Sequence, residues 1–211
     1  MKVSKNKIAM ALLVAAVAVT VPAAVNAAST ADSELTQEIT NGALSTDVRN
    51  VSGQIVASPS FAMDTATVST SQQSVDGVFG TNTQRISVDN PGAADSGWTL
   101  ALNATTPGTG VWSDGSNDYA YNDASPANGQ LTVDPSAGTV TALQGTSTGV
   151  SLAASPATFT GSGAITIATA TAGSADIWNG YFTGIDLAQT IPASQPSGNY
   201  SLDVTQTVAA Q

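Results

Sequence analysis

The chain of 211 residues contains no cysteine and no histidine. Without cysteine no disulfide can form, so the burial of apolar side chains must stabilise the fold by itself. Without histidine a serine nucleophile lacks its usual general base. Residues 145–149 (GTSTG), which match the G-x-S-x-G motif of hydrolases, are therefore assigned to a turn. A pair of aspartates lining a cleft would be the remaining route to hydrolysis. The sequence predicts a protein that is not an enzyme.

Positive charge is scarce and is concentrated at the N-terminus. The chain has 5 Lys and Arg residues against 15 Asp and Glu residues, for a formal net charge of −10. Three lysines stand among the first seven residues, an apolar run covers residues 8–21, and Val25-Asn26-Ala27 fits a small-residue cleavage site. This order predicts a secretory signal peptide over residues 1–27, because the apolar run is too short to span a bilayer.

Cleavage of that peptide would make the exported chain still more acidic. It would remove three lysines and no acidic residue, so the formal charge would change from −10 to −13 with Arg49 and Arg85 as the remaining cations. Such a surface repels phosphate backbones and anionic lipid headgroups. No second long apolar run follows in the sequence. We therefore expect a secreted, extracellular protein with no nucleic-acid partner and no membrane insertion after cleavage.

Long amphipathic helical patterns are also lacking, and alternating patterns take their place. Residues 85–89 alternate apolar and polar side chains, residues 90–92 (Asn-Pro-Gly) have the composition of a turn, and a second alternating run begins at Trp98. Short strands at close spacing, separated by glycine and proline turns, predict an all-β fold, an antiparallel β-sandwich. We expect a single sandwich domain over residues 41–211, preceded by a flexible leader over residues 28–40.

Two of the predicted strands resemble a known family. Residues 98–100 (WTL) and the run from Tyr200 to Val208 (YSLDVTQTV) are similar to the paired motifs of the WxL domain of bacterial surface proteins. Gln206 stands where that family has its second tryptophan. The resemblance implies a secreted domain that attaches non-covalently to cell-wall peptidoglycan or an associated glycan, often together with other surface proteins. Strand alternation predicts that the motif residues face the core; they are Trp98, Leu100, Tyr200, Val204 and Val208.

An acidic and aromatic stretch over residues 112–123 (WSDGSNDYAYND) is the best candidate for a binding site. Oxygen ligands at alternate positions suit Ca²⁺, and the candidate ligands are Asp114, Ser116, Asp118 and Asp123. The same stretch brings together three aromatic side chains that can stack on sugar rings, namely Trp112, Tyr119 and Tyr121. A third interpretation is a long turn in which the acidic side chains bind their own backbone. The sequence leaves these three alternatives open, and it indicates no required cofactor, with calcium as the possible one.

A second aromatic cluster surrounds the dipeptide Asn179-Gly180. Trp178 precedes it and Tyr181 follows it, and Asn-Gly is a frequent turn of β-hairpins. Two interpretations follow. The aromatic side chains either face the core of a hairpin, or they form an exposed patch that binds the wall or a partner.

These features predict a secreted, non-catalytic cell-surface protein that associates non-covalently with the bacterial cell wall through a WxL-like β-sandwich. The alternative is a structural subunit of a pilus or surface layer that assembles by strand or edge pairing, because an unpaired edge strand serves that role directly. Both roles place the chain outside the cell.

Overall fold

The computed structural model describes residues 31–173 and 176–211. The expected signal peptide and the start of the leader fall within residues 1–30, outside this range. The chain divides into two units, Met1–Glu38 and Ile39–Gln211. Residues 31–38 of the first unit form no strand, helix or turn, and the second unit carries the fold. Among the described residues, no helix has the length and apolar character needed to cross a membrane.

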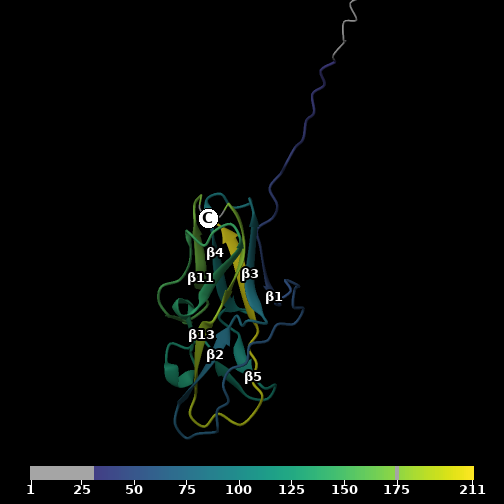
Figure 1. Cartoon of the computed structure of the whole chain (residues 1–211). Coiled ribbons are helices and arrows are strands. Elements are labelled where there is room, and N and C mark those ends of the chain that lie inside the picture. Colours follow the sequence, from purple (N-terminus) through teal and green to yellow (C-terminus); the bar gives the residue numbers. More distant parts are fainter. Residues whose placement is uncertain (1–30, 174–175) are drawn as a thin grey trace, which may run out of the picture. The chain divides into compact units, whose positions relative to one another are not determined.

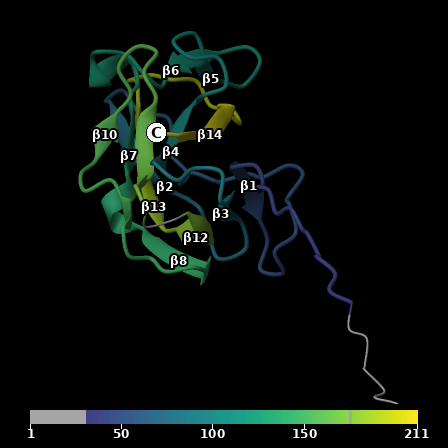
Figure 2. The ribbon, with the colours of Figure 1, turned by 90° about the horizontal axis from the view of Figure 1, so that it is seen from above.

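The second unit is an antiparallel β-sandwich of short strands, as the sequence predicts (Figure 1). One sheet contains, in spatial order, β1 (Ser45–Arg49), β3 (Arg85–Pro91), β12 (Ile177–Thr183) and β8 (Thr139–Gln144). The facing sheet contains β14 (Val204–Ala210), β4 (Gly97–Ala104), β11 (Ile165–Thr171) and β9 (Val150–Leu152). In the view from above, β1 and β14 lie at the same side of the two layers (Figure 2); β8 and β9 lie beside each other at the opposite side.

A third sheet extends the first one and contains, in order, β10 (Ala157–Thr158), β7 (Leu131–Asp134), β13 (Ile185–Ile191) and β2 (Gln73–Phe79). The strand β12 leads directly into β13 through Gly184, which has a φ of +75°. Glycine adopts this left-handed conformation without a steric penalty, so the chain bends there and passes from one sheet to the next. A small hairpin of β5 (Val111–Ser113) and β6 (Asp118–Ala120) completes the strands. Two single-turn 3₁₀ helices cover Pro126–Asn128 and Pro135–Ala137.

The core of the sandwich is built around Trp98. Its side chain has no exposed surface and contacts two aromatic rings of the facing sheet, with centroid distances of 5.5 Å to Trp178 and 6.3 Å to Phe182. Leu100, two residues along β4, is also completely buried. The prediction that Trp98 and Leu100 face the core is therefore confirmed.

The C-terminal half of the WxL-like motif departs from its predicted placement. The strand begins at Val204 rather than Tyr200, since residues 192–200 form a loop. Val208 packs against the core and Tyr200 is half-buried, but the Val204 side chain is 37% exposed. The core prediction is wrong for Val204 and Tyr200, because both side chains line an open groove and neither belongs to the core.

The dipeptide Asn179-Gly180 is not a turn, so the predicted hairpin is wrong. It lies inside β12, which pairs with β3 on one side and with β8 on the other. A β-carbon on Gly180 would overlap the indole of Trp178 and the carbonyl oxygen of Thr141 in β8. Glycine is thus required by the packing of the tryptophan ring, which is 1% exposed and lies in the core. Tyr181 points the other way and is half-buried, with the guanidinium carbon of Arg85 4.4 Å from its ring centroid.

Candidate binding groove

A groove with a volume of about 1210 Å³ runs along the second unit. Ligand pockets of proteins are typically roughly 300–1,000 Å³, so this groove can take up an extended ligand. Residues 59–69 form one wall; they contain no strand and make a single bridge, between Met63 and Gly77. Residues 195–206 form the other wall. Buried apolar side chains of two sheets reach the groove between these walls, namely Phe79, Leu102, Leu131 and Leu187.

One end of the groove is lined by three neighbouring aromatic rings. Trp112 in β5 and Tyr119 in β6 are cross-strand neighbours, with ring centroids 6.1 Å apart and planes 10° from parallel. Tyr200 joins them from the loop before β14, edge-on to Tyr119 at 5.2 Å. The predicted proximity of Trp112 and Tyr119 is therefore confirmed. We call these three residues the aromatic cluster.

Tyr121, the third aromatic residue predicted for this site, lies elsewhere. Its side chain has no exposed surface, and its ring packs on Phe159 at 5.2 Å in the core. The phenol oxygen accepts a hydrogen bond of 3.3 Å from the backbone N–H of Gly108. The β6 strand ends at Ala120, so the alternation that predicts a shared face for Tyr119 and Tyr121 does not extend to Tyr121. The prediction of ligand contact by Tyr121 is wrong.

Buried and half-buried amide groups hold the aromatic cluster in place. Gln189 in β13 is completely buried; its side-chain oxygen accepts a bond of 2.8 Å from the indole N–H of Trp112, and its NH₂ group donates to the carbonyl oxygen of Thr190 at 2.7 Å. Gln195 donates to the Tyr200 hydroxyl at 2.9 Å, and that hydroxyl donates to the Pro196 carbonyl oxygen at 2.9 Å. These bonds fix the orientation of the rings before any ligand binds, which lowers the entropic cost of binding.

The aspartates of the neighbouring loop bind backbone amides. The Asp114 carboxylate accepts bonds from the N–H groups of Asn117 at 2.7 Å and Ser116 at 2.8 Å. These two bonds, that of Asn117 first, hold the pKa of Asp114 below its ordinary value of 3.8. Asp123 lies in a separate turn, where it accepts from the Ser125 N–H at 2.8 Å.

Asp114 and Asp123 thus bind nearby backbone N–H groups, as expected for the third interpretation of this stretch, a long turn. Among the described residues, no group of three or more His, Cys, Asp or Glu side chains is placed to hold a metal ion. Calcium binding by Asp114, Ser116, Asp118 and Asp123 stays a prediction.

The titration of Tyr119 reports on the aromatic cluster. Burial, together with the nearby Tyr200, raises the pKa of Tyr119 from 10.0 to about 12. The unfolded chain then loses this proton at lower pH than the folded chain, so the free energy of unfolding is expected to fall between pH 10 and about 12. Denaturation at a series of pH values measures this. The fall in the free energy of unfolding with pH should be smaller in Tyr119→Phe than in the native protein, and unchanged in Tyr181→Phe. An equal fall in Tyr119→Phe and the native protein would contradict the assignment.

Known proteins give no further guide to this groove. No family model, no curated protein and no solved structure matches the chain. A function must therefore be argued from the groove itself, the surface charge and the motif resemblance.

Proposed function

We propose that the chain is a secreted, non-catalytic cell-surface protein that binds a cell-wall glycan at the aromatic end of the groove. The observation that carries this proposal is the aromatic cluster, in which Trp112, Tyr119 and Tyr200 come together from separate segments to line an open cavity. Aromatic rings offer apolar faces to the C–H faces of sugars, while nearby amide side chains can bind hydroxyl groups. Gln195 and Asn199 line the groove beside the rings and supply such amides.

The charge of the protein restricts the kind of wall polymer. With 15 acidic residues against 5 basic ones, the chain lacks the lysine and arginine clusters that bind phosphate groups. A phosphate-rich wall polymer is therefore disfavoured, and the glycan of peptidoglycan or a neutral glycan attached to it fits better.

The resemblance to the WxL domain supports the same role. It implies attachment to the wall, but Trp98 and Leu100 of the motif are completely buried and have no surface to offer a ligand. In this chain the contact with the wall would instead be made by the groove.

Co-sedimentation with purified cell-wall sacculi tests the proposal. Residues 28–211 are expected to pellet saturably, and Tyr200→Ala should weaken binding by roughly tenfold, which corresponds to about 1.4 kcal/mol. Tyr200 is suitable because its ring is half-buried and lies outside the strands. Tyr181→Ala is the matched control, since Tyr181 is an aromatic residue outside the groove. Absence of pelleting, or equal pelleting of both variants, would overturn the proposal.

The same assay examines calcium. If a chelator abolishes pelleting and added calcium restores it, binding depends on calcium. If calcium fails to restore the pelleting of Asp114→Asn, the acidic loop takes part in the binding mechanism. Pelleting that is indifferent to chelator would leave the loop as a structural turn.

A further inference from the structure

The two arginines of the sandwich stand side by side. Beyond the lysines of the N-terminus, Arg49 and Arg85 are the only Lys or Arg residues in the sequence, against 15 acidic residues. Arg49 in β1 and Arg85 in β3 are direct partners in the antiparallel register. The β-carbons of such partners lie about 4.5–5.5 Å apart, and their side chains leave the sheet on the same face. The positive charge of the second unit is therefore gathered at one place, which we call the arginine pair.

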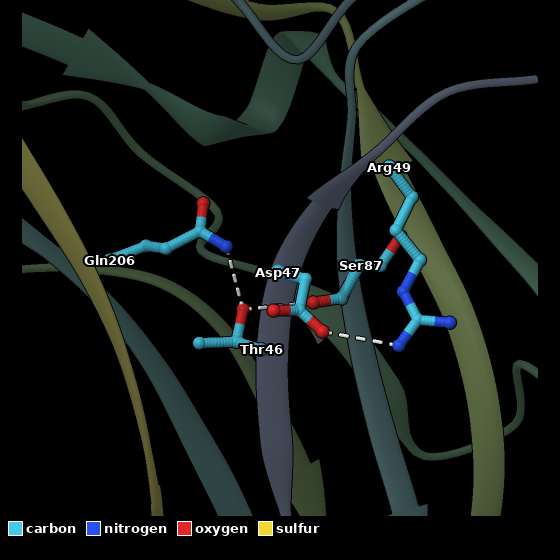
Figure 3. A network of polar contacts seen from close by, with 5 residues as sticks. All are labelled: Thr46, Asp47, Arg49, Ser87 and Gln206. Atoms are coloured by element: carbon cyan, nitrogen blue, oxygen red, sulfur yellow. Dashed lines mark hydrogen bonds and ion pairs between the residues drawn. The ribbon is translucent and has the colours of Figure 1, made fainter. Parts of the chain in front are cut away.

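The arginine pair lies on the outer face of the first sheet. Ile86, the neighbour of Arg85 in β3, is completely buried, so Arg85 points away from the core. The same division holds along β1. Thr46 points toward Gln206 of the facing sheet and accepts its amide at 2.8 Å, while Arg49 lies on the other side of the strand (Figure 3). Neither arginine lines the groove. The arginine pair thus belongs to a separate surface.

The charge of the arginine pair is only partly neutralised. Arg49 donates to the Asp47 carboxylate at 3.1 Å, which is the one ion pair among the described residues (Figure 3). Arg85 has no acidic partner within that part of the chain, although the chain has 15 acidic residues. Like charges directly opposite each other on neighbouring strands are destabilising. Two positive charges against one negative charge leave a net charge of +1 at this place.

Most hydrogen-bonding groups of the arginine pair are also unused. Each guanidinium has about five N–H donors in a planar fork. Among the described residues, the Arg49 side chain makes one hydrogen bond, to Asp47, and the Arg85 side chain makes one, from Nε to the carbonyl oxygen of Asn82 at 3.1 Å. The Arg49 side chain is 29% exposed and Arg85 is half-buried, so a ligand can reach both. Guanidinium groups with free edges bind carboxylates through two parallel hydrogen bonds.

Apolar and aromatic side chains flank the arginine pair. Ile55 forms a β-bridge with Arg49 on the side of β1 away from β3, and it is 63% exposed. On the opposite side, the ring of Tyr181 in β12 lies against the guanidinium of Arg85. Interfaces between proteins are enriched in arginine and aromatic residues and contain apolar side chains at their centre. A surface of this composition fits a protein segment better than a free ion.

We propose that the outer face of the first sheet binds an acidic segment of another protein, with a carboxylate held between Arg49 and Arg85. One carboxylate neutralises the net charge of this place, whereas a phosphate group would bring a charge of roughly −1.5 to −2 to an acidic protein. Apolar residues of the segment would contact Ile55. The binding acts at short range, because the acidic remainder of the surface is screened beyond about 8 Å at physiological salt. This inference does not depend on glycan binding.

Nuclear magnetic resonance of residues 28–211 tests the proposal directly, since this chain has two arginines and therefore two side-chain Nε–H signals. The Nε of Arg49 is buried and that of Arg85 is hydrogen-bonded, so both protons are expected to exchange slowly enough to be observed. Arg49→Lys and Arg85→Lys assign the signals. A short peptide of alternating Glu and Ala is expected to shift both signals along a saturable curve. The same peptide with Gln in place of Glu should shift neither.

Three results would overturn the proposal. One is the absence of shifts with the Glu peptide, and a second is equal shifts with sodium chloride at the same ionic strength. A third is equally tight binding of inorganic phosphate, which would contradict the preference for carboxylate.

A substitution separates the arginine pair from the overall charge. Arg85→Gln is expected to weaken binding of the Glu peptide by roughly tenfold, because it removes one of the two guanidinium groups. Gln72→Glu is the matched control, since it changes the net charge by the same amount at an exposed position before β2. The backbone amide spectrum of each variant shows whether the fold is intact. Equal weakening in both variants would assign the binding to net charge alone and overturn the proposal.

Discussion

Trp98→Ala is expected to lower the free energy of unfolding by about 3–5 kcal/mol. The indole is completely buried and joins the two sheets through Trp178 and Phe182. Its ring nitrogen has no hydrogen-bond partner, so the expected loss comes from packing and the cavity left behind, with no hydrogen bond involved. Since small domains are typically stable by only about 5–15 kcal/mol, this loss would remove much of the stability of the domain. Urea denaturation of both proteins measures the difference.

Trp98→Phe serves as the control, because it retains an aromatic ring and should cost clearly less than the alanine substitution. A Trp98→Ala protein within about 1 kcal/mol of the native stability would show that the two sheets do not depend on this contact.

Gly180→Ala is the second substitution with a large expected effect, a loss of about 1–3 kcal/mol from overpacking. The added methyl group would meet the Trp178 indole on one side and the Thr141 carbonyl oxygen on the other, and neither can move without disturbing β12 or β8. Gly163→Ala is the matched control, since a β-carbon there meets no atom within 4 Å. Thermal and chemical denaturation should separate the two variants. If Gly180→Ala were as stable as Gly163→Ala, the assigned packing of Trp178 would be incorrect.

The strands around Trp98 were predictable because alternation is a local property. Residues 85–89 and the run from Trp98 both form strands with the expected apolar face buried. Alternation does not tell which strands pair. Residues 90–92 have the composition of a turn, yet β3 continues through Pro91. The strands β3 and β4 lie in opposite sheets, and each pairs with strands distant in sequence.

Local signals failed where packing outweighed them. Asn179-Gly180 is a frequent hairpin dipeptide, yet the glycine is used to seat the Trp178 ring inside a continuous strand. Trp112 and Tyr119 were predictable as neighbours because they flank a short turn. Tyr200 reaches the same cluster from a segment far along the chain, and no pattern within either segment specifies that contact.

The bend at Gly184 connects the groove to the core by a single continuous chain. Gln189, which fixes the Trp112 ring, and Phe182, which packs on Trp98, stand on either side of this bend. The buried side chains of the third sheet also belong to the same core cluster as Trp98, so unfolding is expected to be one cooperative event. A ligand held in the groove would raise the melting temperature of the whole domain, including the distant tryptophan core, by mass action.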